Sequence, residues 1–123
     1  MAQPKAVVVL VEDDLSDLRA LTRLLENSDF DVLAFSQPST VMESNIPNTG
    51  ACLVIDVYLP EMTGVDLCRA LNLSGCRLPV IFITARTDDA TRLLLERADP
   101  VAVLFKPFGR ADLLAAISRA LAL

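Results

Sequence analysis

Polar side chains follow four apolar runs of this sequence, and together they have the composition of a phosphoryl-transfer site. Acids follow the first and third runs, a hydroxyl follows the fourth and a lysine the last: Glu12, Asp13, Asp56, Thr84 and Lys106. Carboxylates at close range repel one another and stay ionised only with a cation among them. Oxygen ligands without histidine or thiolate select a hard ion, so Mg²⁺ is the cofactor that we expect. A carboxylate nucleophile, Mg²⁺, a lysine and a hydroxyl are the groups that phosphoryl transfer requires.

Each of these residues also has an ordinary structural interpretation. Asp13 or Asp14 stands where the N-cap of a helix is expected, and Asp56 precedes a proline-containing turn. Thr84 would then cap a strand end, and Lys106 would be a solvated surface lysine. Taken singly, the cap and the turn are the better interpretations. Taken together, they require unrelated features to coincide at one edge of a sheet, so we favour a common site.

Alternating strand and helix patterns must position these side chains. Apolar runs predict strands over residues 6–11, 30–35, 51–55, 78–83 and 101–105. Helical spacing predicts helices over residues 15–28, 38–45, 65–73, 88–98 and 111–121. This alternation predicts a three-layer α/β fold, a flavodoxin-like (βα)5 with a parallel five-stranded sheet in the order 2-1-3-4-5. In that order strands one, three, four and five are neighbours, so the polar residues at their ends converge.

Composition limits the classes of protein that fit. The 123 residues suit a single domain over 1–123, and 53% of them are hydrophobic. The net charge of −5 argues against a nucleic-acid-binding face, so nucleic acid would be contacted only through a separate output domain. Three cysteines without a CxxC pair, and no histidine, argue against zinc and favour reduced thiols in the cytoplasm. The apolar runs are too short to span a membrane, and MAQPKAVVVL lacks signal-peptide features.

Four short motifs occur in the order and at the spacing of a known family: VEDD (11–14), DVYLPEMTG (56–64), VIFITA (80–85) and FKPF (105–108). Through them the chain resembles the receiver domain of two-component response regulators, the CheY-like family. Each motif alone is weak, but the set is specific and extends over essentially the whole chain. The segments LRALTRLL (18–25) and LPVIFITAR (78–86) look most like receivers of the FixJ-like transcriptional branch. The resemblance implies a signalling phosphoacceptor rather than a turnover enzyme.

The resemblance implies a role for each acid. Asp56 would be the phosphoacceptor, attacking the phosphorus of a phosphohistidine on a partner sensor histidine kinase. Asp13 and Asp56 would ligate Mg²⁺, helped by Glu12 through water and by the backbone carbonyl of Tyr58.

It also implies roles for the residues around the acids. Thr84 would hydrogen-bond the phosphoryl group once Asp56 is modified, and Lys106 would pair first with Asp56 and then with the phosphoryl oxygens. The Lys106–Pro107 bond would be cis, as in the family. Tyr58 and Arg86 would tune the lifetime of the phosphoryl group.

The chain departs from the family at several positions. Val103 stands three residues before the lysine, where the family often has an aromatic side chain that couples to the threonine. A valine has no ring to move inward, so we expect this chain to depart from the usual Thr–aromatic switch. Asp29 and Asp99 stand where the family favours glycine, and Phe105 stands where a polar residue is common. An exposed Phe105 next to Val103 would make the edge of strand five an apolar surface suited to binding another protein. The family uses that surface, together with the fourth and fifth helices, for dimers and partners, so we expect a homodimer there.

Two registers fit the first acid cluster. One makes Glu12 and Asp13 the acidic pair and puts Asp17 where the family usually has an apolar helix residue. A shift by one residue makes Asp13 and Asp14 the pair and places Leu18 in the core. Asp13 belongs to both registers.

Other functions compete with this interpretation. A phosphatase with an aspartyl nucleophile commonly carries a second acid two residues later, where this chain has Tyr58. A flavin-binding domain would need a Ser/Thr/Gly-rich loop after strand one, where the acids would instead repel a phosphate. The main alternative is a stand-alone or pseudo-receiver that signals by protein contact without an aromatic switch, as Val103 suggests. Nothing follows the last helix, so the chain is either a stand-alone receiver or lacks an output domain, expected to regulate transcription.

Overall fold

A computed structural model describes residues 4–123, in which strands and helices alternate along the chain. Residues 1–3 of the expected domain lie outside the described part. In chain order the elements are β1 (Val7–Val11), α1 (Leu15–Asn27), β2 (Asp31–Phe35), α2 (Pro38–Glu43), β3 (Ala51–Asp56), α3 (Gly64–Leu73), β4 (Val80–Thr84), α4 (Asp89–Glu96), β5 (Ala102–Phe105) and α5 (Arg110–Leu121).

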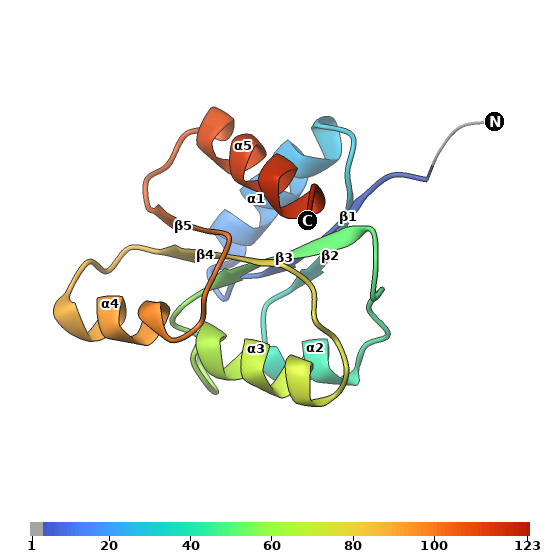
Figure 1. The fold of residues 1–123 in the computed structure, drawn as a ribbon. Helices are drawn as coiled ribbons and strands as arrows, with labels where there is room; N and C mark the ends of the chain where they lie inside the picture. The colour runs from blue at the N-terminus through green and yellow to red at the C-terminus, as the bar shows by residue number, and fades with distance from the viewer. Residues whose placement is uncertain (1–3) are drawn as a thin grey trace.

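The strands form one parallel sheet in the order β2-β1-β3-β4-β5, which confirms the predicted flavodoxin-like fold (Figure 1). Val7 of β1 lies between Asp31 of β2 and Ala51 of β3. After β2 the chain crosses back over β1 to begin β3, so the strand order reverses between β1 and β3. A crevice at such a reversal, outside the carboxyl ends of the strands, is where this architecture binds ligands.

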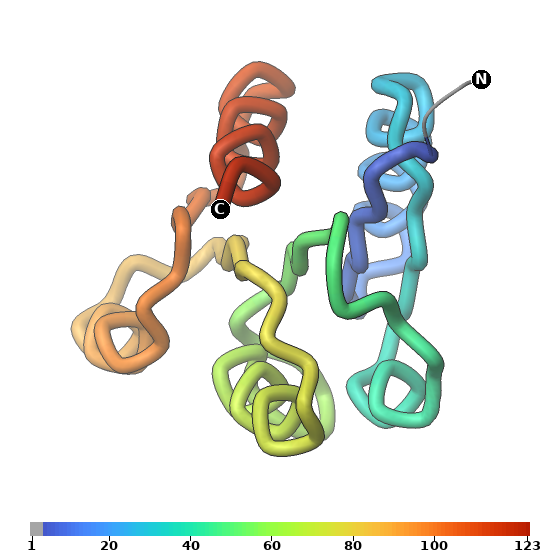
Figure 2. The backbone as a smooth tube through the Cα atoms, turned by 45° about the vertical axis from the view of Figure 1, so that its right-hand side comes forward, coloured from blue at the N-terminus to red at the C-terminus, as the bar shows by residue number. Residues whose placement is uncertain are grey.

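Helices cover both faces of the sheet. α1 and α5 lie on one face, and α2, α3 and α4 lie on the other (Figures 1 and 2). Residues 8–11 of β1 are all completely buried, as are residues 54 and 55 of β3. Successive side chains alternate between the two cores: Val9 packs toward α2 and α3, and Leu10 packs toward α1 and α5. The central strands therefore hold their carboxyl ends rigidly.

Several predicted boundaries are wrong by one or two residues. β4 begins at Val80 rather than Leu78, because Pro79 has no N–H to donate to the ladder; its carbonyl still accepts from Leu53 at 2.9 Å. α2 ends at Glu43 rather than near residue 45, since Ser44 already has extended backbone angles. Asp56 is the last residue of β3 itself and not the residue after it. The phosphoacceptor candidate is thus fixed by a strand.

Two aspartates have left-handed backbone conformations, at the positions where the family favours glycine. Asp29 has φ 73° and Asp99 has φ 48°. Asp is one of the few residues other than glycine that visits this region without large strain. Both loops therefore keep the turn that glycine would otherwise make.

Within residues 4–123, no helix is long and apolar enough to cross a membrane.

Candidate functional site

Four neighbouring strands bring the predicted polar residues to one edge of the sheet. Glu12 directly follows β1, and its N–H donates to Phe35 of β2 at 3.0 Å. Asp56 ends β3 and is paired with Ile83 of β4, and the next residue of β4 is Thr84. Lys106 directly follows β5, and its N–H donates to the Thr84 carbonyl at 2.9 Å. The convergence expected from the strand order is confirmed.

The Lys106 ammonium lies among three carboxylates. Its Nζ donates to Asp56 Oδ2 at 2.9 Å and to Glu12 Oε1. Asp17 Oδ2, on the first turn of α1, lies 3.5 Å from the same nitrogen. The Glu12 side chain is completely buried, whereas that of Lys106 is 22% exposed. One cation thus compensates two carboxylates inside the protein and approaches a third at the surface.

The protonation equilibria reflect this crowding. Burial, together with the hydrogen-bonded Asp56 carboxylate, raises the pKa of the Glu12 carboxyl to about 8, although Lys106 opposes the shift. Burial also disfavours the Lys106 ammonium, but its hydrogen bonds to Glu12 and Asp56 outweigh that effect and raise the lysine pKa. The site therefore has a deficit of positive charge that a further cation would relieve.

The acids are arranged as a hard cation would require. Glu12, Asp13 and Asp56 each present a carboxylate oxygen, and these oxygens all lie within 4.8 Å of one another. Glu12 Oε2 is buried and, among the described residues, has no hydrogen-bond partner. An orphaned buried carboxylate oxygen beside two other acids fits a bound Mg²⁺ and its water shell. The donor set thus agrees with the expected cofactor.

Asp14 is separate from this group. It is the N-cap of α1, and its Oδ1 accepts the N–H of Asp17 at 2.9 Å. The cap interpretation, weighed for Asp13 and Asp14, thus holds for Asp14. Glu12 and Asp13, rather than Asp13 and Asp14, lie beside Asp56. The acidic pair is therefore that of the first register, although Leu18 packs against the core as the second register expected.

The loop after Asp56 folds back tightly beneath it. The Tyr58 N–H donates to Asp56 Oδ1 at 3.1 Å, and the Gly64 N–H donates to the Val57 carbonyl at 2.7 Å. A Cβ on Gly64 would lie 2.4 Å from the Asp56 carbonyl oxygen and 2.8 Å from an Ile55 methyl. Glycine is required there because the backbone of α3 passes so close to β3. This packing positions Asp56, and it places Tyr58 directly beside it.

Thr84 is completely buried, and its hydroxyl is already engaged. Its Oγ1 accepts the backbone N–H of Arg86 at 3.1 Å. A hydroxyl that accepts one hydrogen bond still has its own proton to donate. The Lys106–Pro107 bond is cis, as predicted.

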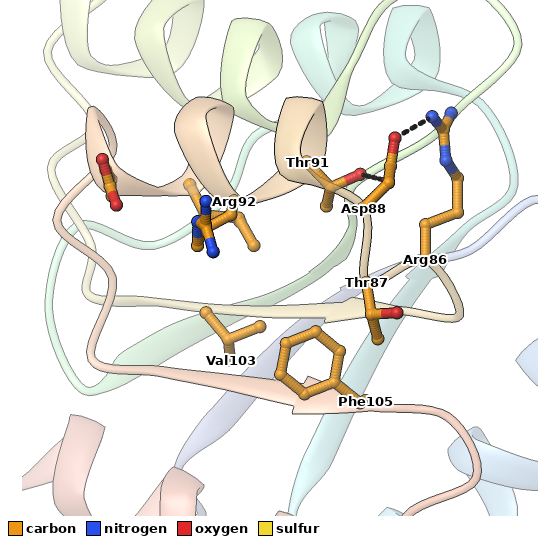
Figure 3. Close-up of a pocket in the computed structure, with 9 residues that line it drawn as sticks. Arg86, Thr87, Asp88, Thr91, Arg92, Val103 and Phe105 are labelled. Atoms are coloured by element: carbon orange, nitrogen blue, oxygen red, sulfur yellow. Dashed lines mark hydrogen bonds and ion pairs between the residues drawn. The ribbon is translucent and has the colours of Figure 1, made fainter.

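A groove lies between α4 and β5. It has a volume of about 330 Å³ and is lined on the β5 side by Val103 and Phe105, whose side chains project toward α4 (Figure 3). Phe105 is 48% exposed, so the predicted apolar surface is present. With valine at position 103, this groove is open rather than filled by an aromatic ring.

The sequence patterns did not identify three polar residues near the site as functional candidates: Asp17, Asp88 and Thr91. Asp88 follows the fourth strand and precedes a helix, so its position as N-cap was foreseeable. Arg86 pairs with Asp88 at 2.7 Å and lies over the Tyr58 ring, 4.2 Å from its centroid. The hydrogen bond from Arg86 raises the pKa of that guanidinium and lowers the pKa of the Asp88 carboxyl.

The cysteines take no part in the site. All three are buried free thiols. Burial raises the pKa of Cys52 and of Cys68 to about 12, so both remain neutral and unreactive.

Comparison with known proteins identifies the family. A family model described as the response regulator receiver domain matches residues 8–118. Nodulation protein W of Bradyrhizobium diazoefficiens is 36% identical over 116 residues, which cover 94% of this chain and 51% of that protein. Transcriptional regulatory protein FixJ of Azorhizobium caulinodans is 28% identical over 114 residues, which cover 93% of this chain and 54% of that protein.

A solved structure agrees with these relatives. The response regulator StyR is 34% identical, with a TM-score of 0.86, and the match covers 97% of this chain and 60% of StyR. The chain spans about half the length of the curated relatives it matches. With its strand order, its acid cluster and a family match from residue 8 to residue 118, the chain belongs to the response regulator receiver domain family.

Proposed function

We propose that Asp56 accepts a phosphoryl group from a phosphohistidine on a sensor histidine kinase. The observation that carries this proposal is the position of Asp56: its Oδ2 is held by Lys106 at 2.9 Å, and the oxygens of Glu12 and Asp13 lie beside it. A carboxylate oxygen of Asp56 attacks phosphorus, the P–N bond breaks, and the imidazole leaves with the bonding electron pair. Receiver domains are signalling modules, so this self-modification replaces substrate turnover.

The surrounding side chains fit the successive needs of that step. Glu12, Asp13 and Asp56 would hold Mg²⁺, with the backbone carbonyl of Tyr58 completing the protein ligands. Bound there, Mg²⁺ neutralises charge that develops on the transferred phosphoryl oxygens. Lys106, already bonded to Asp56, exchanges a carboxylate oxygen for a phosphoryl oxygen. Thr84 donates its free hydroxyl proton to another.

The proposed output is a change at the α4–β5–α5 face. A phosphoryl group adds negative charge and strong acceptor oxygens, which recruit Thr84 and through it the loop into α4. Exposed Phe105 beside the open groove suits that face to homodimer formation. The curated relatives are about twice as long as the matched region. By analogy with FixJ, we propose a cytoplasmic regulator whose output domain controls transcription.

A stand-alone or pseudo-receiver is the second candidate, and one observation favours it. Val103 lines the groove where the family often has an aromatic side chain, so the ring that would couple to Thr84 is missing. Such a protein would present the α4–β5 surface constantly and would not respond to phosphorylation.

Phosphorylation by a small donor tests the proposal. We expect incubation with acetyl phosphate and Mg²⁺ to add one phosphoryl group, measured by intact-protein mass, and chelation of Mg²⁺ to prevent the gain. Asp56→Asn should abolish it, whereas Asp31→Asn, at an exposed position in β2, should leave it unchanged. Absence of the mass gain in the native sequence, or its persistence in Asp56→Asn, would refute the assignment.

A further inference from the structure

An open chain of contacts, here named the α4 circuit, runs from Asp56 to Thr84 through the first turn of α4. From Asp56, the Tyr58 N–H donates to Oδ1 at 3.1 Å, and the Tyr58 hydroxyl lies 2.6 Å from Thr91 Oγ1. Thr91 then bonds to Asp88 at 2.5 Å, and Asp88 pairs with Arg86 at 2.7 Å. The backbone N–H of Arg86 donates to Thr84 Oγ1 at 3.1 Å, where the circuit ends.

The hydrogen bonds of this circuit have a defined direction. The Thr91 hydroxyl has one proton, which it donates to Asp88 Oδ1. The Tyr58 hydroxyl must therefore be the donor to Thr91 Oγ1. Arg86 donates to the other oxygen of Asp88, so both carboxylate oxygens are engaged (Figure 3). Tyr58 and Arg86 thus donate toward α4 from two sides, and the Arg86 guanidinium also lies over the Tyr58 ring.

The Asp88 side chain makes these contacts instead of capping the N-terminus of α4. It is the N-cap of α4, yet its side chain accepts no backbone N–H from that helix. The N-cap of α1, Asp14, and that of α3, Thr63, do accept one. Thr91 is buried to 1% exposure, so its hydroxyl bonds are shielded from water. The first turn of α4 is therefore fastened to the phosphoacceptor loop by side chains rather than capped by its own backbone.

We propose that Asp88 and Thr91 are positioning residues for the modification of Asp56, although neither contacts Asp56 or Thr84. Their contacts with Tyr58 and Arg86 stabilise the arrangement of the β4–α4 loop that accompanies unmodified Asp56, in a chain that has no aromatic ring at position 103. This inference rests on the proposed function.

Thr84 Oγ1 couples the modification of Asp56 to α4, because the hydroxyl that would bond the phosphoryl group also accepts the backbone N–H of Arg86. When Thr84 donates to a phosphoryl oxygen, its Oγ1 moves toward Asp56, and the Arg86 N–H bonded to that oxygen follows. Arg86 is tied to Asp88, and Asp88 to Thr91, so the displacement disrupts the Tyr58–Thr91 hydrogen bond. By linkage, removal of a contact made only in the unmodified state favours the modified state by the same factor.

Beryllofluoride, an analogue of a phosphoryl group on a carboxylate, provides the test. Its affinity in the presence of Mg²⁺ is measured for the native sequence, Thr91→Val, Tyr58→Phe and the double variant. We expect each single variant to bind about fivefold more tightly, the equivalent of one net hydrogen bond. The double variant should gain no more than the larger single change, because both remove the same bond.

Two controls separate positioning from stability. Thr91→Ser keeps the hydroxyl and should restore native affinity. Thr22→Val removes a helical hydroxyl that bonds only to the Leu18 carbonyl of α1, and it should leave affinity unchanged. Unfolding by urea is followed in parallel, since a purely structural role would lower stability without raising affinity.

The outcomes distinguish this inference from the proposed function. Beryllofluoride binding by the native sequence, with equal or weaker binding by Thr91→Val and Tyr58→Phe, would overturn the positioning role and leave the phosphoacceptor intact. Absence of binding to the native sequence would instead remove the phosphoacceptor, and this inference with it.

Discussion

The two sides of the site differ in how deeply their side chains are buried and how firmly they are paired. At the ends of β1 and β3, Glu12 and Asp56 are buried, bonded to Lys106 and held by strands whose neighbours are fixed. On the side of α4 and β5, the groove beside Val103 is open, Phe105 is exposed, and polar side chains fasten the helix. The proposed phosphoacceptor site and the proposed output surface are therefore supported by different kinds of structure.

That difference has a physical basis. Ionised groups in a low-dielectric interior need fixed partners, because an unpaired buried charge costs several kcal/mol or shifts its pKa. A surface that changes shape needs few buried contacts and several alternatives of similar free energy. Substitutions at the β1–β3 end should accordingly cost stability, and those at the α4–β5 face should not.

The largest expected effect is at Gly64. Gly64→Ala should lower the free energy of unfolding by about 3 kcal/mol or more, because the new Cβ meets the Asp56 carbonyl and the Ile55 methyl. The control is Gly109→Ala, whose Cβ would meet only Asp112 Oδ2, at 3.6 Å. Urea unfolding measures both, and equal losses for the two variants would show that the close approach at Gly64 has no special role.

Glu12 should make stability depend on pH when Mg²⁺ is absent. Its pKa is raised from 4.5 to about 8, so the folded protein keeps a proton that the unfolded chain releases above pH 4.5. This contribution to the free energy of unfolding is fully present below pH 4.5 and is lost as pH rises from there through 8.

The matched variant isolates that contribution. Glu12→Gln cannot titrate, so its free energy of unfolding in urea should not show this fall between about pH 4.5 and about pH 8, while other groups still titrate. Parallel pH profiles for the native sequence and Glu12→Gln would contradict the raised pKa.

Val103 tests the opposite side. Val103→Phe should change the unfolding free energy by less than about 1 kcal/mol, because the ring has the groove of about 330 Å³ to enter. Val9→Phe, at a completely buried valine of β1, should cost about 1–3 kcal/mol or more through overpacking. A loss at position 103 as large as the loss at position 9 would mean that the α4–β5 face is packed like the core.

Phe105 should give the smallest effect. Phe105→Ala removes a half-exposed ring and should cost less than about 1 kcal/mol, whereas Phe82→Ala, at a fully buried ring, should cost about 3–5 kcal/mol. A thermal-unfolding comparison is sufficient. A comparable cost at both positions would contradict the account of Phe105 as a surface for partners.

The sequence predicted the edge of the sheet better than the loops beside it. The convergence of Asp56, Thr84 and Lys106 followed from strand order alone, because parallel strands end at a common edge. The contact of Asp17 with Lys106 and the circuit through Asp88 and Thr91 did not. They depend on side-chain directions and on the path of the β4–α4 loop, which no period of apolar residues encodes. Boundaries shifted where a single residue, such as Pro79, overrode the apolar pattern.

Amide hydrogen exchange after phosphorylation compares the two sides within one molecule and tests the central claim directly. With Asp56 fully phosphorylated by acetyl phosphate, we expect exchange to change over residues 84–96 while residues 38–43 of α2 stay as they were. That result would show that modification at the rigid acid cluster reaches α4 without an aromatic ring at position 103. Unchanged exchange over residues 84–96, in protein whose mass shows complete phosphorylation, would contradict it.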